Sequence, residues 1–106
     1  MLRRFVTGRS ARVDFEWDAA KAASNGRKHG VGFDEAAAVF ADPRVWIRPD
    51  DVHSWSEDRW LATGRASDGR IVTVSYTMKG ETIRLISAWR SPPRDRRAYD
   101  QDDRPD

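Results

Sequence analysis

Cysteine is absent from this 106-residue chain, and histidine occurs only twice. The lack of cysteine excludes disulfide bonds and thiolate metal sites, and His29 and His53 are too few for a typical structural zinc site. No apolar run approaches the roughly 20 residues that a membrane-spanning helix needs. The first residues, MLRRFVTGRSARV, are basic but contain no apolar core long enough for a signal peptide. We therefore expect a cytoplasmic protein that does not contact a membrane.

The charge of the chain is nearly balanced but unevenly distributed. There are 19 Lys and Arg residues against 17 Asp and Glu, which gives a net charge of +2. Residues 1–13 contain four arginines and no acid, whereas the last seven residues, DQDDRPD, are acidic. A folded middle with arginines on one face fits a polyanionic partner, RNA above all. The same arginine content also fits a plain solvated surface, and charge alone does not separate the two interpretations.

The segment from Arg59 to Arg90 reads as three strands joined by two tight turns. Asp68-Gly69 and Lys79-Gly80 mark the turns, because glycine accepts the positive φ that a tight hairpin needs. Val, Ile, Thr, Trp and Tyr are frequent between the turns, as is typical of strands. Regular alternation in the third strand places Arg84 and Arg90 on one face, roughly 20 Å apart. This cationic face is where the pattern predicts function.

The remainder of the chain predicts helices that cover this sheet. Asp18 is an N-cap candidate for a first helix that ends near Gly30, and Phe33 to Phe40 carry one apolar stripe of a second helix. A last short helix begins at Pro93. We expect an α+β domain with an antiparallel four- to five-stranded sheet, two N-terminal helices packed on it and a short C-terminal helix. The expected core joins side chains from all these parts, namely Phe33, Phe40, Trp60, Val74 and Ile86.

The expected organisation is one domain flanked by two tails. Residues 1–13 show no periodicity and are expected to be a flexible N-terminal extension. Residues 14–100 form the single domain, a length that suits one modest core. Residues 101–106 are expected to be a disordered acidic tail.

The string FEWDAAKAASNGRKHGVGFDEAAAVFADP, followed by an acidic loop and the element IRLISA, resembles the BrnT family of type II toxins. The resemblance covers about residues 15–100. It implies a fold similar to that of RelE-like ribonucleases, and a metal-independent ribonuclease that needs no cofactor and blocks translation. It also implies neutralisation by a ribbon-helix-helix antitoxin of the BrnA type, with DNA contacted only through that antitoxin.

Metal-free cleavage of RNA needs a base for the 2′-hydroxyl, an acid for the leaving 5′-oxygen and cations for the phosphate. Arginine grips phosphate oxygens with its planar fork, and an imidazole or a carboxylate can move the proton. The expected catalytic residues are Arg90, Arg84, Arg59, Glu57 and His29. The expected RNA-binding residues are Lys28, Arg65, Tyr76 and Tyr99. For each there is a structural alternative, such as an ion pair for an arginine, a helix-end contact for His29 or a core position for a tyrosine.

A second hypothesis is a catalytically weak module that binds RNA or a partner and acts as corepressor with its antitoxin. Members of the BrnT family often have Arg where this chain has Trp89, and an acidic residue where it has Met78. The departure at Trp89 favours the binding module. Growth arrest on expression of the domain distinguishes a toxin from a module that only binds.

Overall fold

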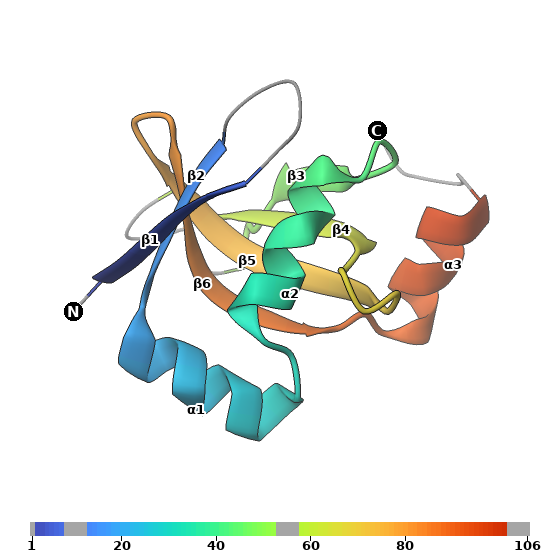
Figure 1. The fold of residues 1–106 in the computed structure, drawn as a ribbon. Helices are drawn as coiled ribbons and strands as arrows, with labels where there is room; N and C mark the ends of the chain where they lie inside the picture. The colour runs from blue at the N-terminus through green and yellow to red at the C-terminus, as the bar shows by residue number, and fades with distance from the viewer. Residues whose placement is uncertain (1, 8–12, 53–57, 102–106) are drawn as a thin grey trace.

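The computed structural model describes residues 2–7, 13–52 and 58–101, in which six strands form one sheet with helices packed around it (Figure 1). The strands are β1 (Leu2–Thr7), β2 (Val13–Asp18), β3 (Trp46–Pro49), β4 (Trp60–Arg65), β5 (Ile71–Lys79) and β6 (Thr82–Arg90). The helices are α1 (Ala19–His29), α2 (Phe33–Ala37) and α3 (Pro93–Gln101), and a 3₁₀ helix η1 (Ala38–Ala41) continues α2. This confirms the α+β class.

The strand order is β1-β2-β6-β5-β4-β3, and the predicted meander of β4, β5 and β6 is confirmed. Gly69 and Gly80 take the expected positive φ values of 92° and 64° in the two turns. The expectation of a fully antiparallel sheet is wrong at one place, because β2 and β6 pair in parallel. Parallel neighbours need a long crossover, and the whole chain from α1 to β5 provides it. The sheet is therefore mixed.

The N-terminal segment differs from the expected extension. Leu2–Thr7 pair with β2 as an antiparallel edge strand, and Val13 is already the first residue of β2. This strand raises the sheet above the expected four to five strands. Its partner lies only a few residues further along the chain, so a hairpin forms without any strong periodicity in the sequence.

The ends of α1 follow the local signals in the sequence. The Asp18 carboxylate accepts hydrogen bonds from the backbone N–H groups of Ala20 (2.8 Å) and Lys21 (3.2 Å). At the other end, Gly30 takes φ = 68°, and its N–H donates to the carbonyl of Gly26 at 2.9 Å. These contacts satisfy the unpaired backbone groups that every helix end presents. The cap residues thus fix the length of α1 and the place where its cationic end stops.

We expected the two N-terminal helices to pack on one face of the sheet, but they lie at different places around it. In Figure 1, α2 lies in front of the sheet, α1 lies below it and α3 lies beside it. α2 and η1 cover the apolar face of β4, β5 and β6, whereas α1 is fastened to the side of β6. Within the described part of the chain, no helix is long and apolar enough to cross a membrane.

The core lies between the sheet and α2, and the expected set of core residues is confirmed in part. Phe33 and Val74 are buried in it, and Phe40 and Trp60 are partly buried against it. Ile86 is partly buried but lies outside this cluster, because a bulge in β6 interrupts the alternation of side chains at this residue. The buried apolar residues are Phe15, Trp17, Val31, Phe33, Ala36, Ala37, Val39, Ala62, Ala66, Val72, Val74, Tyr76, Ile83, Leu85 and Ala88.

Candidate functional site

A β-bulge in β6 decides which side chains share a face. Ser75 of β5 is opposite Ser87, but the next residue, Tyr76, is opposite Leu85, so Ile86 has no partner across the ladder. One extra residue switches the alternation of all the residues that follow. Ile86 is therefore not part of the buried core, and its side chain lines a surface pocket instead.

The bulge corrects the prediction that Arg84 and Arg90 share a face. Arg84 is opposite Thr77 of β5, and Arg90 is opposite Val72. Directly opposed residues point to the same side of a sheet, and Thr77 and Val72, five residues apart in a regular strand, point to opposite sides. The two guanidinium groups therefore do not form one clamp on one sheet face.

α1 is held against β6 by the side chain of Asn25, which is only 6% exposed. β2 pairs with β6 no further than Arg84. Beyond that residue, the side chain of Asn25 binds the backbone of β6 at Ala88. Its Nδ2 donates to the carbonyl of Ala88 at 2.8 Å and to the carbonyl of Val31 at 3.0 Å. Its Oδ1 accepts from the N–H of Ala88 at 3.1 Å and from Ser87 Oγ at 3.0 Å. The amide thus replaces a neighbouring strand.

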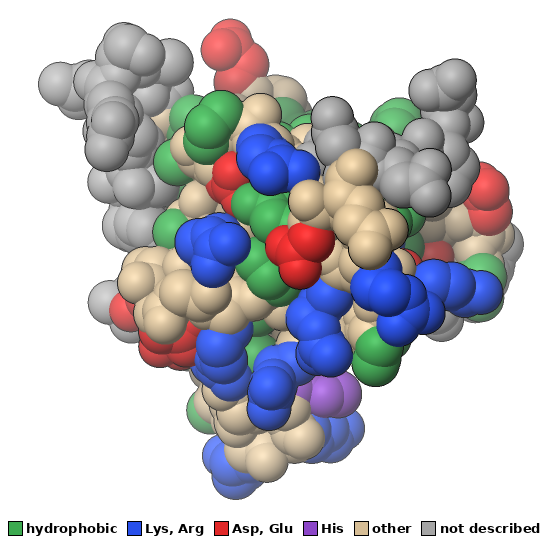
Figure 2. Space-filling view, turned by 90° about the vertical axis from the view of Figure 1, so that its right-hand side faces the viewer, with side chains coloured by type: hydrophobic (Ala, Val, Ile, Leu, Met, Phe, Trp, Pro, Cys, Tyr) green, Lys and Arg blue, Asp and Glu red, His purple; other side chains and the backbone are tan. Residues whose placement is uncertain are grey.

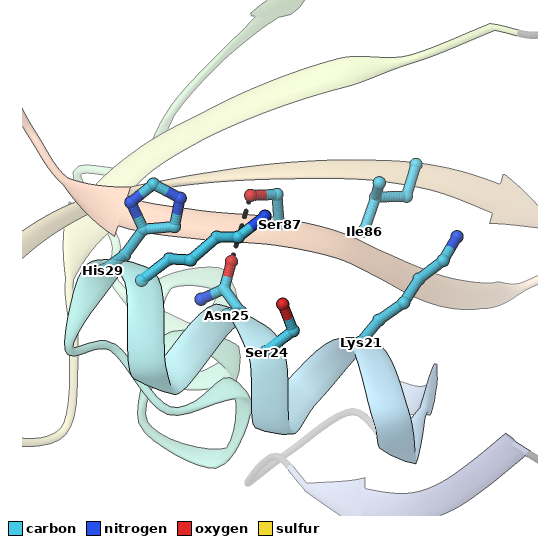
Figure 3. A pocket seen from close by; sticks show the side chains of 7 residues that line it. Lys21, Ser24, Asn25, His29, Ile86 and Ser87 are labelled. Carbon is cyan, nitrogen blue, oxygen red and sulfur yellow. Dashed lines mark hydrogen bonds between the residues drawn. The ribbon is translucent and has the colours of Figure 1, made fainter.

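The bulge and the fastened helix enclose a shallow pocket of about 180 Å³ (Figure 3). Five of its lining residues come from α1 and two from β6: Lys21, Ser24, Asn25, Lys28, His29, Ile86 and Ser87. The α1 residues are spaced by three, four, seven and eight positions from the first, which is the spacing of one helix face. We call this site the α1–β6 pocket.

The α1–β6 pocket is cationic. Lys21, Lys28 and His29 are all exposed at its rim. Figure 2 shows Lys and Arg side chains gathered around an imidazole, which is that of His29, the one histidine among the described residues. Lysine donates hydrogen bonds as a flexible point charge, and an imidazole has ring nitrogens that can donate or accept a proton. The pocket therefore has groups of the types that bind a phosphate and move a proton.

Of the predicted site residues, Lys28 and His29 are brought together at this pocket, and several others lie elsewhere. Arg90 is exposed at the end of β6, and Arg84 is partly buried at its beginning. Arg59 precedes β4, where its carbonyl accepts the N–H of Asp50 at 2.9 Å. Glu57 lies outside the described residues, as do His53 and Trp55.

The two predicted RNA-binding tyrosines are buried. Tyr76 is 5% exposed, and its ring packs edge-on against Phe40 with the centroids 4.8 Å apart. Burial raises the pKa of its hydroxyl. Tyr99 is 3% exposed, with the guanidinium of Arg44 at 5.3 Å from its ring centroid. Both side chains are therefore packed inside the protein, which is the structural alternative to stacking on an RNA base.

Arg65 and Tyr99 meet at the carboxylate of Asp42, which fastens α3 to the end of β4. The Tyr99 hydroxyl donates to Asp42 Oδ2, which also accepts the N–H of Arg65 at 2.8 Å. Burial alone would raise the pKa of Asp42, but hydrogen bonds from Tyr99, Arg44 and Arg65 outweigh it and lower that pKa. Burial and the same hydrogen bond raise the pKa of Tyr99. These hydrogen bonds give Asp42, Arg65 and Tyr99 a structural role, because they attach α3 to the end of β4.

Four pocket residues were not among those singled out from the sequence: Lys21, Ser24, Asn25 and Ser87. Lys21 and Asn25 share a helix face with Lys28, and this helical spacing was a signal that pointed to them. The role of Asn25 depends on a strand more than sixty positions away, and nothing local indicates it. Ser87 lines the pocket directly beside the bulge.

The fold and the pocket together define a small α+β domain with a cationic site suited to a polyanionic ligand. The model of the family described as "Ribonuclease toxin, BrnT, of type II toxin-antitoxin system" matches residues 17–95. The chain belongs to this BrnT family of ribonuclease toxins, for which RNA is the substrate and an antitoxin is the partner. A comparison with curated proteins finds none that matches.

Proposed function

We propose that this chain cleaves RNA at the α1–β6 pocket without a metal ion and thereby inhibits translation. The observation that carries the proposal is that Lys28 and His29 line one pocket together. They are a phosphate-binding cation and a proton-transfer group, the two functions that the reaction needs at one place. Arg84, Arg90 and Arg59 stay predictions as catalytic residues, but they do not line this pocket, and in this proposal they serve as further contacts to the RNA.

In the proposed reaction, the imidazole of His29 removes the proton of the ribose 2′-hydroxyl. The 2′-oxygen attacks the adjacent phosphorus, the bond from phosphorus to the 5′-oxygen breaks, and that oxygen takes a proton from a water molecule. Lys28 stabilises the charge that develops on the phosphate oxygens. The products are a 2′,3′-cyclic phosphate and a 5′-hydroxyl, and Glu57 stays a predicted second proton-transfer group.

The proposed partner is a ribbon-helix-helix antitoxin of the BrnA type, and the fold is proposed to be RelE-like. An antitoxin that covers the cationic surface around His29 in Figure 2 would block the approach of RNA. The charge of that surface favours an acidic antitoxin segment. DNA is then contacted by the antitoxin and not directly by this chain.

The reaction can be tested with purified protein and a labelled RNA in excess EDTA. We expect cleavage to persist and the 5′ fragment to end in a cyclic phosphate. His29→Ala should lower the rate by about 10²–10⁴, the usual contribution of a proton-transfer group. Arg27→Ala is the matched control, because Arg27 is exposed on α1 but does not line the pocket. Cleavage that stops in EDTA, or equal rates for the two variants, would contradict the proposal.

A further inference from the structure

Lys21 lies at the end of the α1–β6 pocket that is remote from the proposed proton-transfer group. Figure 3 shows Lys21 beside Ile86 and His29 at the opposite end, with Ser87 between them. Lys21 and Lys28 are seven residues apart, which is roughly 10 Å along a helix axis at 1.5 Å per residue. The two lysines therefore leave α1 about two helical turns apart along the pocket.

The surroundings of Lys21 leave its ammonium group available to a ligand. The side chain is exposed. The nearby carboxylate of Asp18 accepts two backbone N–H groups on its Oδ1 as the cap of α1, and the Lys21 charge is the weakest of the influences that lower the pKa of Asp18. From β6, the neighbouring strand, the pocket receives Ile86 and Ser87, which carry no charge. Asn25, in the floor, has both donors and the acceptor engaged.

We propose that Lys21 binds a second phosphate of the RNA strand, next to the one that Lys28 and His29 hold. The nucleotide between the two phosphates lies over Ile86 and Ser87. This inference rests on the proposed function, because it assumes that the scissile phosphate is at His29. It assigns the pocket a ligand with at least two consecutive phosphates and makes Lys21 a residue that recognises the flanking one.

The size of the effect follows from the exposure of the lysine. An exposed ion pair contributes about 0.2–1 kcal/mol, which corresponds to a change of up to about fivefold in affinity. Each phosphate contact on a single strand adds about 0.7 to the slope of log affinity against log salt. Loss of the Lys21 contact should lower both quantities, and only for a ligand that has the flanking phosphate.

The experiment measures binding of two oligoribonucleotides with 2′-fluoro groups in place of the 2′-hydroxyls, which cannot be cleaved by the proposed route. One is a dinucleoside monophosphate and the other is a trinucleoside diphosphate. NMR titration of the labelled protein at low salt gives their affinities for the wild type and for Lys21→Ala, Lys28→Ala and Arg27→Ala.

We expect the ligand with two phosphates to bind the wild type several-fold more tightly, and Lys21→Ala to abolish that difference. Lys28→Ala should weaken both ligands alike, and Arg27→Ala neither. If Lys21→Ala weakens both ligands equally, both lysines hold one phosphate and the inference is wrong while the proposed function stands. If neither ligand shifts the pocket resonances of the wild type, the proposed site itself is wrong.

Discussion

Asn25→Ala tests whether one amide side chain fastens α1 to the sheet. The substitution leaves the N–H and carbonyl of Ala88 and the carbonyl of Val31 without their partner. A buried backbone group that loses its hydrogen bond costs about 1–3 kcal/mol. Because the pocket is open, water can reach part of the exposed edge, so we expect a loss of about 2–4 kcal/mol from a total stability of about 5–15 kcal/mol.

Urea denaturation followed by circular dichroism measures this loss. Ser24→Ala is the matched control, because Ser24 lines the same pocket and surface substitutions usually stay within about 0.5 kcal/mol. Asn25→Asp is a second variant, which keeps the acceptor but turns a carboxylate towards the carbonyls of Val31 and Ala88, so it should be at least as unstable as Asn25→Ala. If Asn25→Ala changes the free energy of unfolding no more than Ser24→Ala does, the strand-like role of the amide is refuted.

Phe40→Ala should destabilise the domain by about 3 kcal/mol, the low end for a buried phenylalanine, because its ring is only partly buried; a melting shift of one or two degrees would show that it is not core. The lowered pKa of Asp42 means that the hydrogen bond from Tyr99 stabilises the fold above the unfolded pKa of about 4 and that this stability is lost as pH falls through the folded pKa. Denaturation between pH 6 and pH 2 should therefore show a steeper loss for the wild type than for Asp42→Asn, and parallel curves would contradict it. Gly64→Ala should cost about 1–3 kcal/mol, because its Cβ would lie 3.0 Å from a methyl group of η1, whereas Gly26→Ala, with nothing within 4 Å, should stabilise α1 by up to about 1 kcal/mol. Thermal melts of the two glycine variants check this, and shifts of the same sign would contradict it.

The parts of the fold that depend on local signals were predictable from the sequence. Single residues with strong conformational preferences determine these parts. They are the cap at Asp18, the helix end at Gly30, the turns at Gly69 and Gly80, and the helix start at Pro93. The parallel pairing of β2 with β6 was not predictable in this way. It joins segments separated by most of the chain, and period-2 alternation does not indicate which strands become neighbours.

The part of the candidate site that depends on neighbouring residues in the sequence was also predictable, whereas the part that depends on strand pairing was not. Lys28 and His29 are adjacent in sequence at a helix end and could be singled out together. The expected pair of Arg84 and Arg90 failed because it assumed unbroken alternation, and the unpaired Ile86 between them shifts the register by one. A bulge depends on packing between strands, so a reading of β6 alone cannot locate it.

Growth arrest by matched variants tests most directly whether the reaction takes place at the α1–β6 pocket. Each variant is expressed under a tight promoter, and its melting temperature is measured on protein purified with the antitoxin and separated from it. We predict that His29→Ala and Lys28→Ala lose arrest while Arg90→Ala and Arg27→Ala keep it, with melting temperatures within about 2 °C of the wild type, as for exposed sites. Full arrest by His29→Ala, together with loss of arrest in Arg90→Ala, would place the reaction at the end of β6 and contradict the proposed site.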